Sequence, residues 1–179
     1  IARVTGSDGV TAAYTYEADG AGGFRVKTVT EGAAGDASAR TLTFSYGANA
    51  TDVIDNAGRT WTYQYDANKR LTAVLEPAVN GMRTRTAYEY DISGNVSRIT
   101  GNAMTGASAG AAQVDVVFRY DNAGNRILQR DLLGNTIGWT YSARNQLLTE
   151  TRYTVVDADG LDPTHVGSTN LPSGALTTQ

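Results

Sequence analysis

The sequence contains no cysteine and a single histidine, His165. Without cysteine, neither disulfide bonds nor thiolate metal sites can form. The 15 lysine and arginine residues are balanced by 18 aspartate and glutamate residues, so the chain lacks the basic excess that a nucleic-acid-binding face requires. No apolar run approaches the ~20 residues that a helix needs to cross a bilayer. We therefore expect no cofactor, no nucleic-acid partner and no membrane span.

What the sequence does contain is paired aromatic residues. Thirteen of its 15 aromatic residues fall into six clusters in which the rings are two positions apart. Because successive side chains of a strand point to opposite sides, this spacing places the rings of a cluster on one face of a strand. The clusters recur at intervals typical of repeat proteins, which predicts a β-repeat array. They are Tyr14 and Tyr16; Phe44 and Tyr46; Trp61, Tyr63 and Tyr65; Tyr88 and Tyr90; Phe118 and Tyr120; and Trp139 and Tyr141.

A turn signal follows most of the clusters. An acidic or hydroxyl side chain comes first and can accept a hydrogen bond from the backbone two residues on, while Gly or Asn at the fourth position tolerates the left-handed conformation that closes a hairpin with a bulge. Similar turns at 55–59 and 131–135 precede the two tryptophans, so consecutive strands should form an antiparallel meander. The clearest turns are Tyr65-Asp66, Tyr90-Asp91 with Gly94, and Tyr120-Asp121 with Gly124.

Residues 10 to 153 resemble the YD repeat of the Rhs family. The resemblance rests on the pattern aromatic-x-Tyr-Asp-x-x-Gly-Asn/Arg-x-Leu/Ile, matched best at 120–127, 90–96 and 65–71. The family includes bacterial Rhs polymorphic toxins, the C components of insecticidal toxin complexes and the YD shell of the animal teneurins. This sequence departs from the pattern at Gly47, Lys69 and Ser142. The resemblance implies an all-β meander of YD-repeat hairpins that is part of a spiralling β-sheet shell.

In members of the family such a shell encloses a toxic C-terminal domain or forms an extracellular scaffold. The resemblance therefore implies a non-catalytic segment of a larger exported protein, secreted or at the cell surface. Its partners would be neighbouring YD repeats of the same parent chain and an enclosed C-terminal toxin domain. Its repeat-motif residues would have structural roles; they are Trp61, Tyr65, Asp66, Tyr90, Asp91, Gly94, Tyr120, Asp121, Gly124, Trp139 and Tyr141.

The aromatic clusters allow two interpretations. Rings that recur at the same place in every hairpin favour packing of ring upon ring between adjacent strands. The alternative is a carbohydrate-binding extracellular adhesion module, in which exposed Tyr and Trp side chains stack on sugars. The extent to which the rings are buried distinguishes the two.

The domain organisation follows the aromatic clusters. Residues 1–156 should form the repeats, about six units, and 157–179 a linker or a long loop leading to a further repeat. The chain begins as if inside a strand, so we expect a segment of a longer polypeptide. Three stretches rich in small residues, 32–39, 80–81 and 101–112, are expected to be extended surface loops.

Candidate chemistry is confined to the C-terminal stretch. Asp157, Asp159 and Asp162 could offer oxygen ligands to calcium, but they lack the bidentate Glu of an EF-hand, so a solvated acidic turn is favoured. His165 is expected to be exposed rather than a general base. Asp162-Pro163 lacks the Asp-Pro-x-Gly order of the self-cleavage motif found in Rhs proteins. The sequence therefore predicts no enzyme, with no catalytic, cofactor-binding or metal-binding residue.

Overall fold

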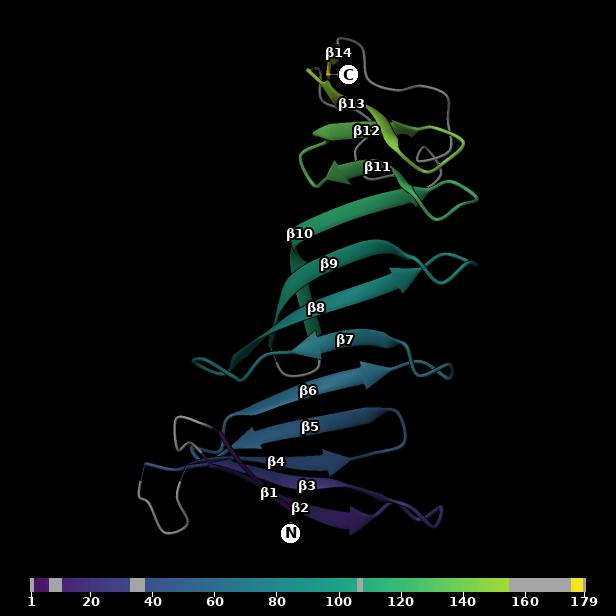
Figure 1. Ribbon diagram of the computed structural model, residues 1–179. Coiled ribbons are helices and arrows are strands. Elements are labelled where there is room, and N and C mark those ends of the chain that lie inside the picture. The colour runs from purple at the N-terminus through teal and green to yellow at the C-terminus, as the bar shows by residue number, and fades with distance from the viewer. Residues whose placement is uncertain (1, 7–10, 33–37, 106–107, 155–174, 179) are drawn as a thin grey trace. The chain divides into compact units, whose positions relative to one another are not determined.

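The computed structural model describes residues 2–6, 11–32, 38–105, 108–154 and 175–178, and every regular element within these ranges is a β-strand. The chain divides into two compact units, residues 1–84 and 85–179. Within each unit, neighbouring strands are antiparallel and follow one another in chain order (Figure 1). The all-β, antiparallel meander expected from the sequence is thus confirmed.

The first unit is built from short strands joined by tight connections. Each strand pairs with the next through an antiparallel ladder. The strands are β1 (Ala2–Thr5), β2 (Thr11–Ala18), β3 (Phe24–Glu31), β4 (Arg40–Tyr46), β5 (Ala50–Asp55), β6 (Thr60–Tyr65) and β7 (Leu71–Leu75).

The second unit contains the longest hairpin of the described chain, formed by β9 and β10. From β9 onward each strand again pairs antiparallel with its successor. β8 begins just before the boundary between the units and lies mostly in the second. The strands are β8 (Met82–Tyr90), β9 (Val96–Thr105), β10 (Ser108–Tyr120), β11 (Arg126–Asp131), β12 (Thr136–Tyr141), β13 (Leu147–Tyr153) and β14 (Ala175–Thr178).

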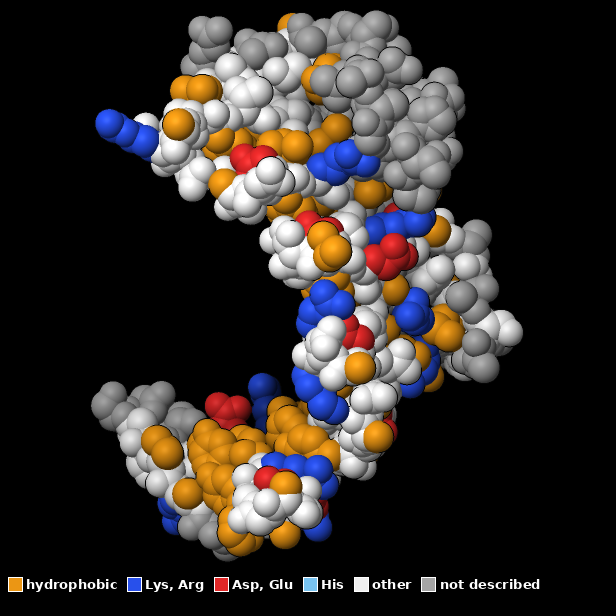
Figure 2. Space-filling model, turned by 90° about the vertical axis from the view of Figure 1, so that its right-hand side faces the viewer, with side chains coloured by type: hydrophobic (Ala, Val, Ile, Leu, Met, Phe, Trp, Pro, Cys, Tyr) orange, Lys and Arg blue, Asp and Glu red, His pale blue; other side chains and the backbone are white. Residues whose placement is uncertain are grey.

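The aromatic clusters fall on alternate strands. All six lie on even-numbered strands, from β2 to β12. In the first unit the strand register places the rings of β2, β4 and β6 on one face, because Tyr14 is opposite Val29, Phe44 opposite Val53, and Thr51 opposite Tyr63. We call this the aromatic face. Figure 2 shows hydrophobic side chains gathered at this level of the molecule, in the lower part of the view.

The opposite face of the first unit is rich in threonine. Thr15 and Thr28 share a hydrogen bond of 2.6 Å between hydroxyls, and Thr30 and Thr41 share one of 3.0 Å. Thr62 donates to Asp52 at 2.7 Å. These cross-strand bonds satisfy the hydroxyls within the sheet. The two faces of the unit therefore differ in chemistry, one apolar and one polar.

Few side chains are fully buried anywhere in the described residues. The buried hydrophobic residues are Ala73, Val117 and Leu128. Most other strand residues are half-buried, including most of the aromatic ones, although Tyr16 and Phe24 are exposed. A single sheet layer cannot enclose a core by itself, so such repeats depend on what packs beside them.

Two of the three surface-loop predictions are wrong. Most of 101–112 belongs to the long β9–β10 hairpin, because ladder hydrogen bonds join backbones and small residues make them as well as large ones. The ladder there is irregular, with register shifts on either side of Ala112. Asn80-Gly81 is a tight two-residue turn between Val79 and Met82, with φ of 52° and 77°. Positive φ at both positions is typical of the hairpin turn that Asn-Gly favours.

The remaining loop prediction falls largely on residues 33–37, outside the described residues. The same holds for the acidic stretch and for His165, which lie within 155–174. The calcium and histidine expectations therefore stay predictions.

Candidate functional site

The aspartate after each YD tyrosine organises its turn. Asp121 Oδ1 accepts hydrogen bonds from the backbone N–H groups of Ala123 and Asn125, both at 2.9 Å. The same carboxylate therefore holds the residue two positions on, as predicted, and also the residue four positions on. Matching pairs of bonds occur at Asp55, Asp66 and Asp131.

A second partner of these aspartates was missed by the sequence reasoning. Asp121 Oδ2 accepts a bond of 3.0 Å from the side-chain amide of Asn125, and Asp66 Oδ2 accepts one of 2.8 Å from Arg70 Nε. The signal was visible, because the residue four positions after the aspartate is always Arg or Asn in these turns. The five pairs are Asp55 with Arg59, Asp66 with Arg70, Asp91 with Asn95, Asp121 with Asn125 and Asp131 with Asn135. We call this arrangement the Asp turn.

Hydrogen bonds in the Asp turn favour the ionised carboxylate. The side-chain and backbone bonds from Asn125 hold the pKa of Asp121 below its ordinary value. The pKa of Asp91 is lowered chiefly by the side chain of Asn95, and that of Asp66 by the backbone N–H of Arg70. These shifts belong to turn geometry, so they do not mark a catalytic group.

The fourth residue of the turn takes up the left-handed conformation. Gly94 and Gly124 have φ of 89° and 82°, which confirms the prediction for both. Lys69 and Asn145 occupy the equivalent position without glycine and have φ of 64° and 60°. Hairpins therefore form at the turns that depart from the family pattern as well.

The residues that replace glycine also reach the preceding turn. Lys69 Nζ donates to the backbone oxygen of Ala48 at 3.0 Å, and Asn145 Oδ1 accepts from Asn125 Nδ2 at 3.0 Å. Ser142 stands in for the aspartate and accepts two longer bonds, of 3.2 Å each, from backbone N–H groups. Lys69 and Asn145 thus each connect a turn to an earlier turn of the same unit.

Three tyrosines of the aromatic clusters use their hydroxyls to join consecutive hairpins. Tyr120 donates to the backbone oxygen of Val96, the first strand residue after the preceding Asp turn, at 3.0 Å. Tyr141 donates in the same way to Arg126 at 3.0 Å, and Tyr46 donates to Val26 at 2.6 Å. Each bond reaches a carbonyl beyond the end of the ladder between the two strands. We call it the tyrosine latch. The sequence showed that a half-buried hydroxyl needs a partner but not which one.

A known repeat family matches part of the chain. The model of the RHS repeat matches residues 47–78, which span the Asp turn at Asp66 and the tryptophan cluster of β6. This match supports the resemblance of the chain to the Rhs, or YD-repeat, family. A comparison with curated proteins gives no match.

Among solved structures, the chain is similar to one titled "Crystal Structure of TcdB2-TccC3-Cdc42". The identity is 11% and the TM-score 0.43, with 84% of this chain covered. The chain spans about one tenth of the length of that structure's chain, 10%.

The aromatic face of the first unit is hollowed across β4, β5 and β6. The rings of Phe44 and Tyr46 stack along β4, with centroids 6.3 Å apart. Val53 of β5 lies between β4 and the rings of β6, so aromatic side chains of different hairpins are separated by an aliphatic strand. The expected ring-upon-ring packing between adjacent strands is therefore wrong in this unit. The hollow is lined by Leu42, Phe44, Tyr46, Thr51, Val53, Tyr63 and Tyr65.

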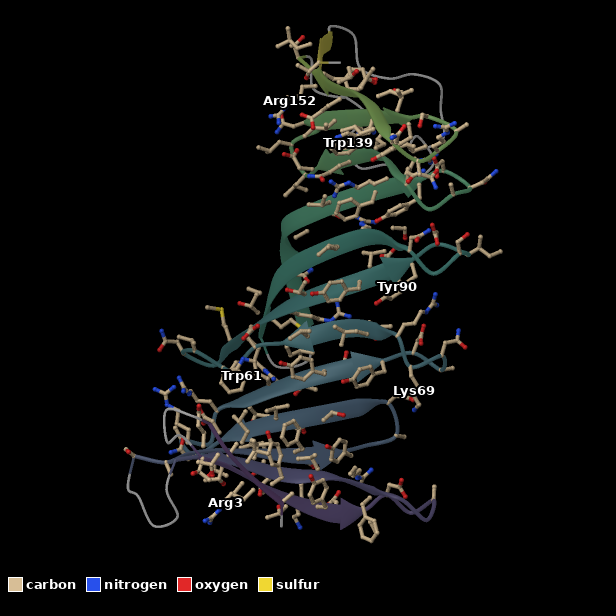
Figure 3. The ribbon with its side chains drawn as sticks, viewed as in Figure 1. Arg3, Trp61, Lys69, Tyr90, Trp139 and Arg152 are labelled. Atoms are coloured by element: carbon tan, nitrogen blue, oxygen red, sulfur yellow. The ribbon has the colours of Figure 1, made fainter. Side chains whose placement is uncertain are left out.

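Arginine side chains cover several of the rings. The Arg25 guanidinium lies 4.3 Å from the centre of the Tyr46 ring. In the second unit Arg126 lies 4.5 Å from Trp139 and 5.7 Å from Phe118, on neighbouring strands. Figure 3 shows Trp139 on β12. Cation–π contacts thus take the place of direct ring contacts.

Both tryptophans of the repeats donate to a carboxylate on the next strand or just beyond it. Trp61 Nε1 donates to Glu76 at 2.7 Å, and Trp139 Nε1 donates to Glu150 at 3.1 Å. The bond from Trp139, followed by one from Arg152, lowers the pKa of Glu150. The polar groups of these two tryptophans are therefore engaged within the chain.

The most buried charges lie in the second unit. Asp115 is 3% exposed and pairs with Arg98 of the neighbouring strand β9. Arg130 is 1% exposed, and its Nε donates to Thr136 at 3.1 Å. Both buried groups thus have a partner on the neighbouring strand, which suits a structural role.

Two further kinds of site are absent from the described residues. They contain no group of three or more His, Cys, Asp or Glu side chains that could hold a metal ion. No helix within them is long and apolar enough to cross a membrane. What the geometry provides is a set of repeated turns that hold an aromatic face.

Proposed function

We propose that this chain is a non-catalytic wall segment of a YD-repeat shell that encloses or presents a toxin or effector domain of a larger exported protein, secreted or at the cell surface. The observation that carries the proposal is the difference between the two faces of the first unit. An apolar aromatic face opposite a threonine face suits a wall whose apolar side is covered by another part of the assembly.

Neighbouring YD repeats of the same parent chain are the proposed partners along the sheet. Within the described residues, β1 pairs only with β2, and β14 only with β13. Each therefore has an outer edge of backbone N–H and C=O groups that a further strand can pair with. We also propose that 1–156 form the repeats and that 157–179 lead to a further repeat, which the pairing of β14 with β13 supports.

A non-catalytic role is supported by how the repeated carboxylates are used. Each aspartate of an Asp turn is bonded to its own turn, and Asp115 is paired with Arg98. A general base needs a carboxylate that can reach a substrate proton. No observation favours the carbohydrate alternative, because the indole N–H groups of Trp61 and Trp139 and a face of Trp139 have partners within the chain.

The proposal is tested by protease protection in the parent polypeptide. We expect the segment enclosed by the intact shell to resist a protease that digests it once it is released by denaturation. Asp121→Ala, which opens an Asp turn, should increase cleavage, whereas Ile92→Ala, at a fully exposed side chain of the equivalent turn, should not. Equal digestion of every segment in the intact and denatured protein would overturn the proposal.

A further inference from the structure

The hollow of the aromatic face continues into a second, polar hollow at one end. The second hollow is lined by Arg25, Tyr46, Gly47, Ala48, Ala50, Thr51, Tyr65 and Lys69. It shares Tyr46, Thr51 and Tyr65 with the aromatic hollow, so the two form one trough across β4, β5 and β6. From Leu42 to Tyr46 the apolar part runs along five strand residues, a length of about 13 Å at ~3.3 Å per residue.

Positive charge is in excess at the tyrosine end of the trough. Arg25 and Lys27 share one carboxylate, that of Glu17, at 2.8 and 3.8 Å. Lys69 is exposed, and its described partner is the uncharged backbone oxygen of Ala48. Asp66 does not offset this charge, because it is paired with Arg70 in its own turn. An ammonium with three donors and one described bond can accommodate a further acceptor.

The opposite end of the trough carries charges of both signs. Trp61 lies at the other end of β6 from the turn that holds Lys69, as Figure 3 shows. Glu76 accepts the Trp61 indole bond there, and the Arg59 guanidinium lies 5.7 Å from the centre of the Trp61 ring. The excess of positive charge therefore distinguishes the tyrosine end of the trough from the tryptophan end.

We propose that this trough docks an extended apolar polypeptide segment that places a carboxylate beside Lys69 and Arg25. The excess positive charge places the acidic end of the segment at the tyrosine end of the trough, because a carboxylate is attracted to Lys69 and Arg25. A polypeptide fits better than a fatty acid, because the trough lies open on a sheet face, where Leu42 is 38% exposed, rather than being enclosed. The inference rests on the proposed function in taking the aromatic face as the side that meets a polypeptide.

The test measures peptide binding to the complete 179-residue chain by fluorescence anisotropy. The probe is an acetylated, amidated peptide in which leucine alternates with serine and the last two residues are aspartate. The comparison peptide has lysine in place of aspartate. We expect the acidic peptide to bind about threefold more tightly at low salt, the size of an exposed ion pair, and the difference to fall as salt is added.

Two variants with matched loss of charge locate the effect. Lys69→Asn removes the positive charge and keeps a residue that tolerates positive φ, so it should abolish the preference for the acidic peptide. Arg144→Asn, at an exposed turn of the second unit, should preserve the preference. Leu42→Ser should weaken binding of both peptides, because it removes apolar surface from the trough.

Each other outcome overturns the inference without deciding the proposed function. Equal binding of the two peptides would show that the charged end of the trough does not distinguish them. A polypeptide could still cover the aromatic face in that case. Binding of a long-chain fatty acid or an oligosaccharide in place of either peptide would show a different occupant. Failure of the proposed function itself is read separately, from loss of protease protection in the parent polypeptide.

Discussion

At the Asp turn, one carboxylate accepts three hydrogen bonds, and the third comes from the side chain of the residue four positions later. Asp121 is bonded to two backbone N–H groups and to the side chain of Asn125. The sequence predicted the first bond, since an aspartate at the start of a turn commonly accepts from the backbone two residues on. It also contained the Arg or Asn at the fifth position, but only the structure connects that residue to the aspartate.

The Asp turns should make the protein sensitive to acid. The pKa of Asp121 is held below the ordinary value of 3.8, mainly by the Asn125 side chain. A carboxylate whose pKa is lowered on folding contributes stability above its unfolded pKa, and this contribution is lost as pH falls through the folded pKa. We expect the midpoint temperature of thermal unfolding to decrease when the pH falls below about 4. This decrease should be smaller in the Asp121→Asn variant.

A matched control for this acid effect is Glu31→Gln, which removes an exposed carboxylate on β3, outside any Asp turn. Thermal unfolding followed by circular dichroism at several pH values measures both variants. An unchanged acid profile for Asp121→Asn would contradict the linkage.

The tyrosine latch gives Tyr46, Tyr120 and Tyr141 a role that phenylalanine could not fill. Tyr120→Phe keeps the ring but leaves the Val96 carbonyl without this donor. We expect a loss of about 1 kcal/mol in the free energy of unfolding, the usual net value of one hydrogen bond. Urea denaturation measures it, with Tyr16→Phe as the control because Tyr16 is 46% exposed and no bond from its hydroxyl is seen. Equal losses in the two variants would argue against the latch.

At the scale of elements, turn chemistry was easier to predict than the length of strands. The aromatic spacing identified six strands and the Asp turns identified their connections, because both signals depend on neighbouring residues. The β9–β10 hairpin was missed, since its outer half is made of small residues whose pairing depends on the backbone of the opposite strand. Composition rich in Gly and Ala indicates a loop only where no partner strand is available.

Glycine at the fourth position of an Asp turn should matter through the backbone alone. Gly124 has φ of 82°, and a Cβ placed there meets no atom within 4 Å. Gly124→Val should therefore cost about 1–2 kcal/mol from left-handed strain without any steric clash. Gly124→Asn should cost less, because Asn adopts this conformation at Asn145. Equal costs for Val and Asn in urea denaturation would contradict this account.

At the scale of the molecule, the chemistry of the trough was beyond the sequence. Lys69 belongs to a turn and Arg25 to a strand 44 positions earlier, and no periodic pattern relates them. Both line the hollow beside Tyr46, because β3, β4, β5 and β6 are paired in register. The sequence predicted that aromatic rings share a face, but only the register decides which charges lie at its ends.

A final prediction concerns the outer edges of β1 and β14 in the isolated chain. Val4 on β1 is 60% exposed and Leu176 on β14 is 68% exposed, and within the described residues each strand has a partner on one side only. Unpaired strand edges with apolar side chains promote edge-to-edge association, and lysine on such a strand opposes it. We expect the 179-residue chain to associate as its concentration rises, and Val4→Lys with Leu176→Lys to reduce this. Sedimentation velocity at several concentrations measures it, with Phe24→Lys, an exposed residue on the interior strand β3, as the control. If the control reduced association as much as the double variant, general surface hydrophobicity rather than the two edges would be responsible.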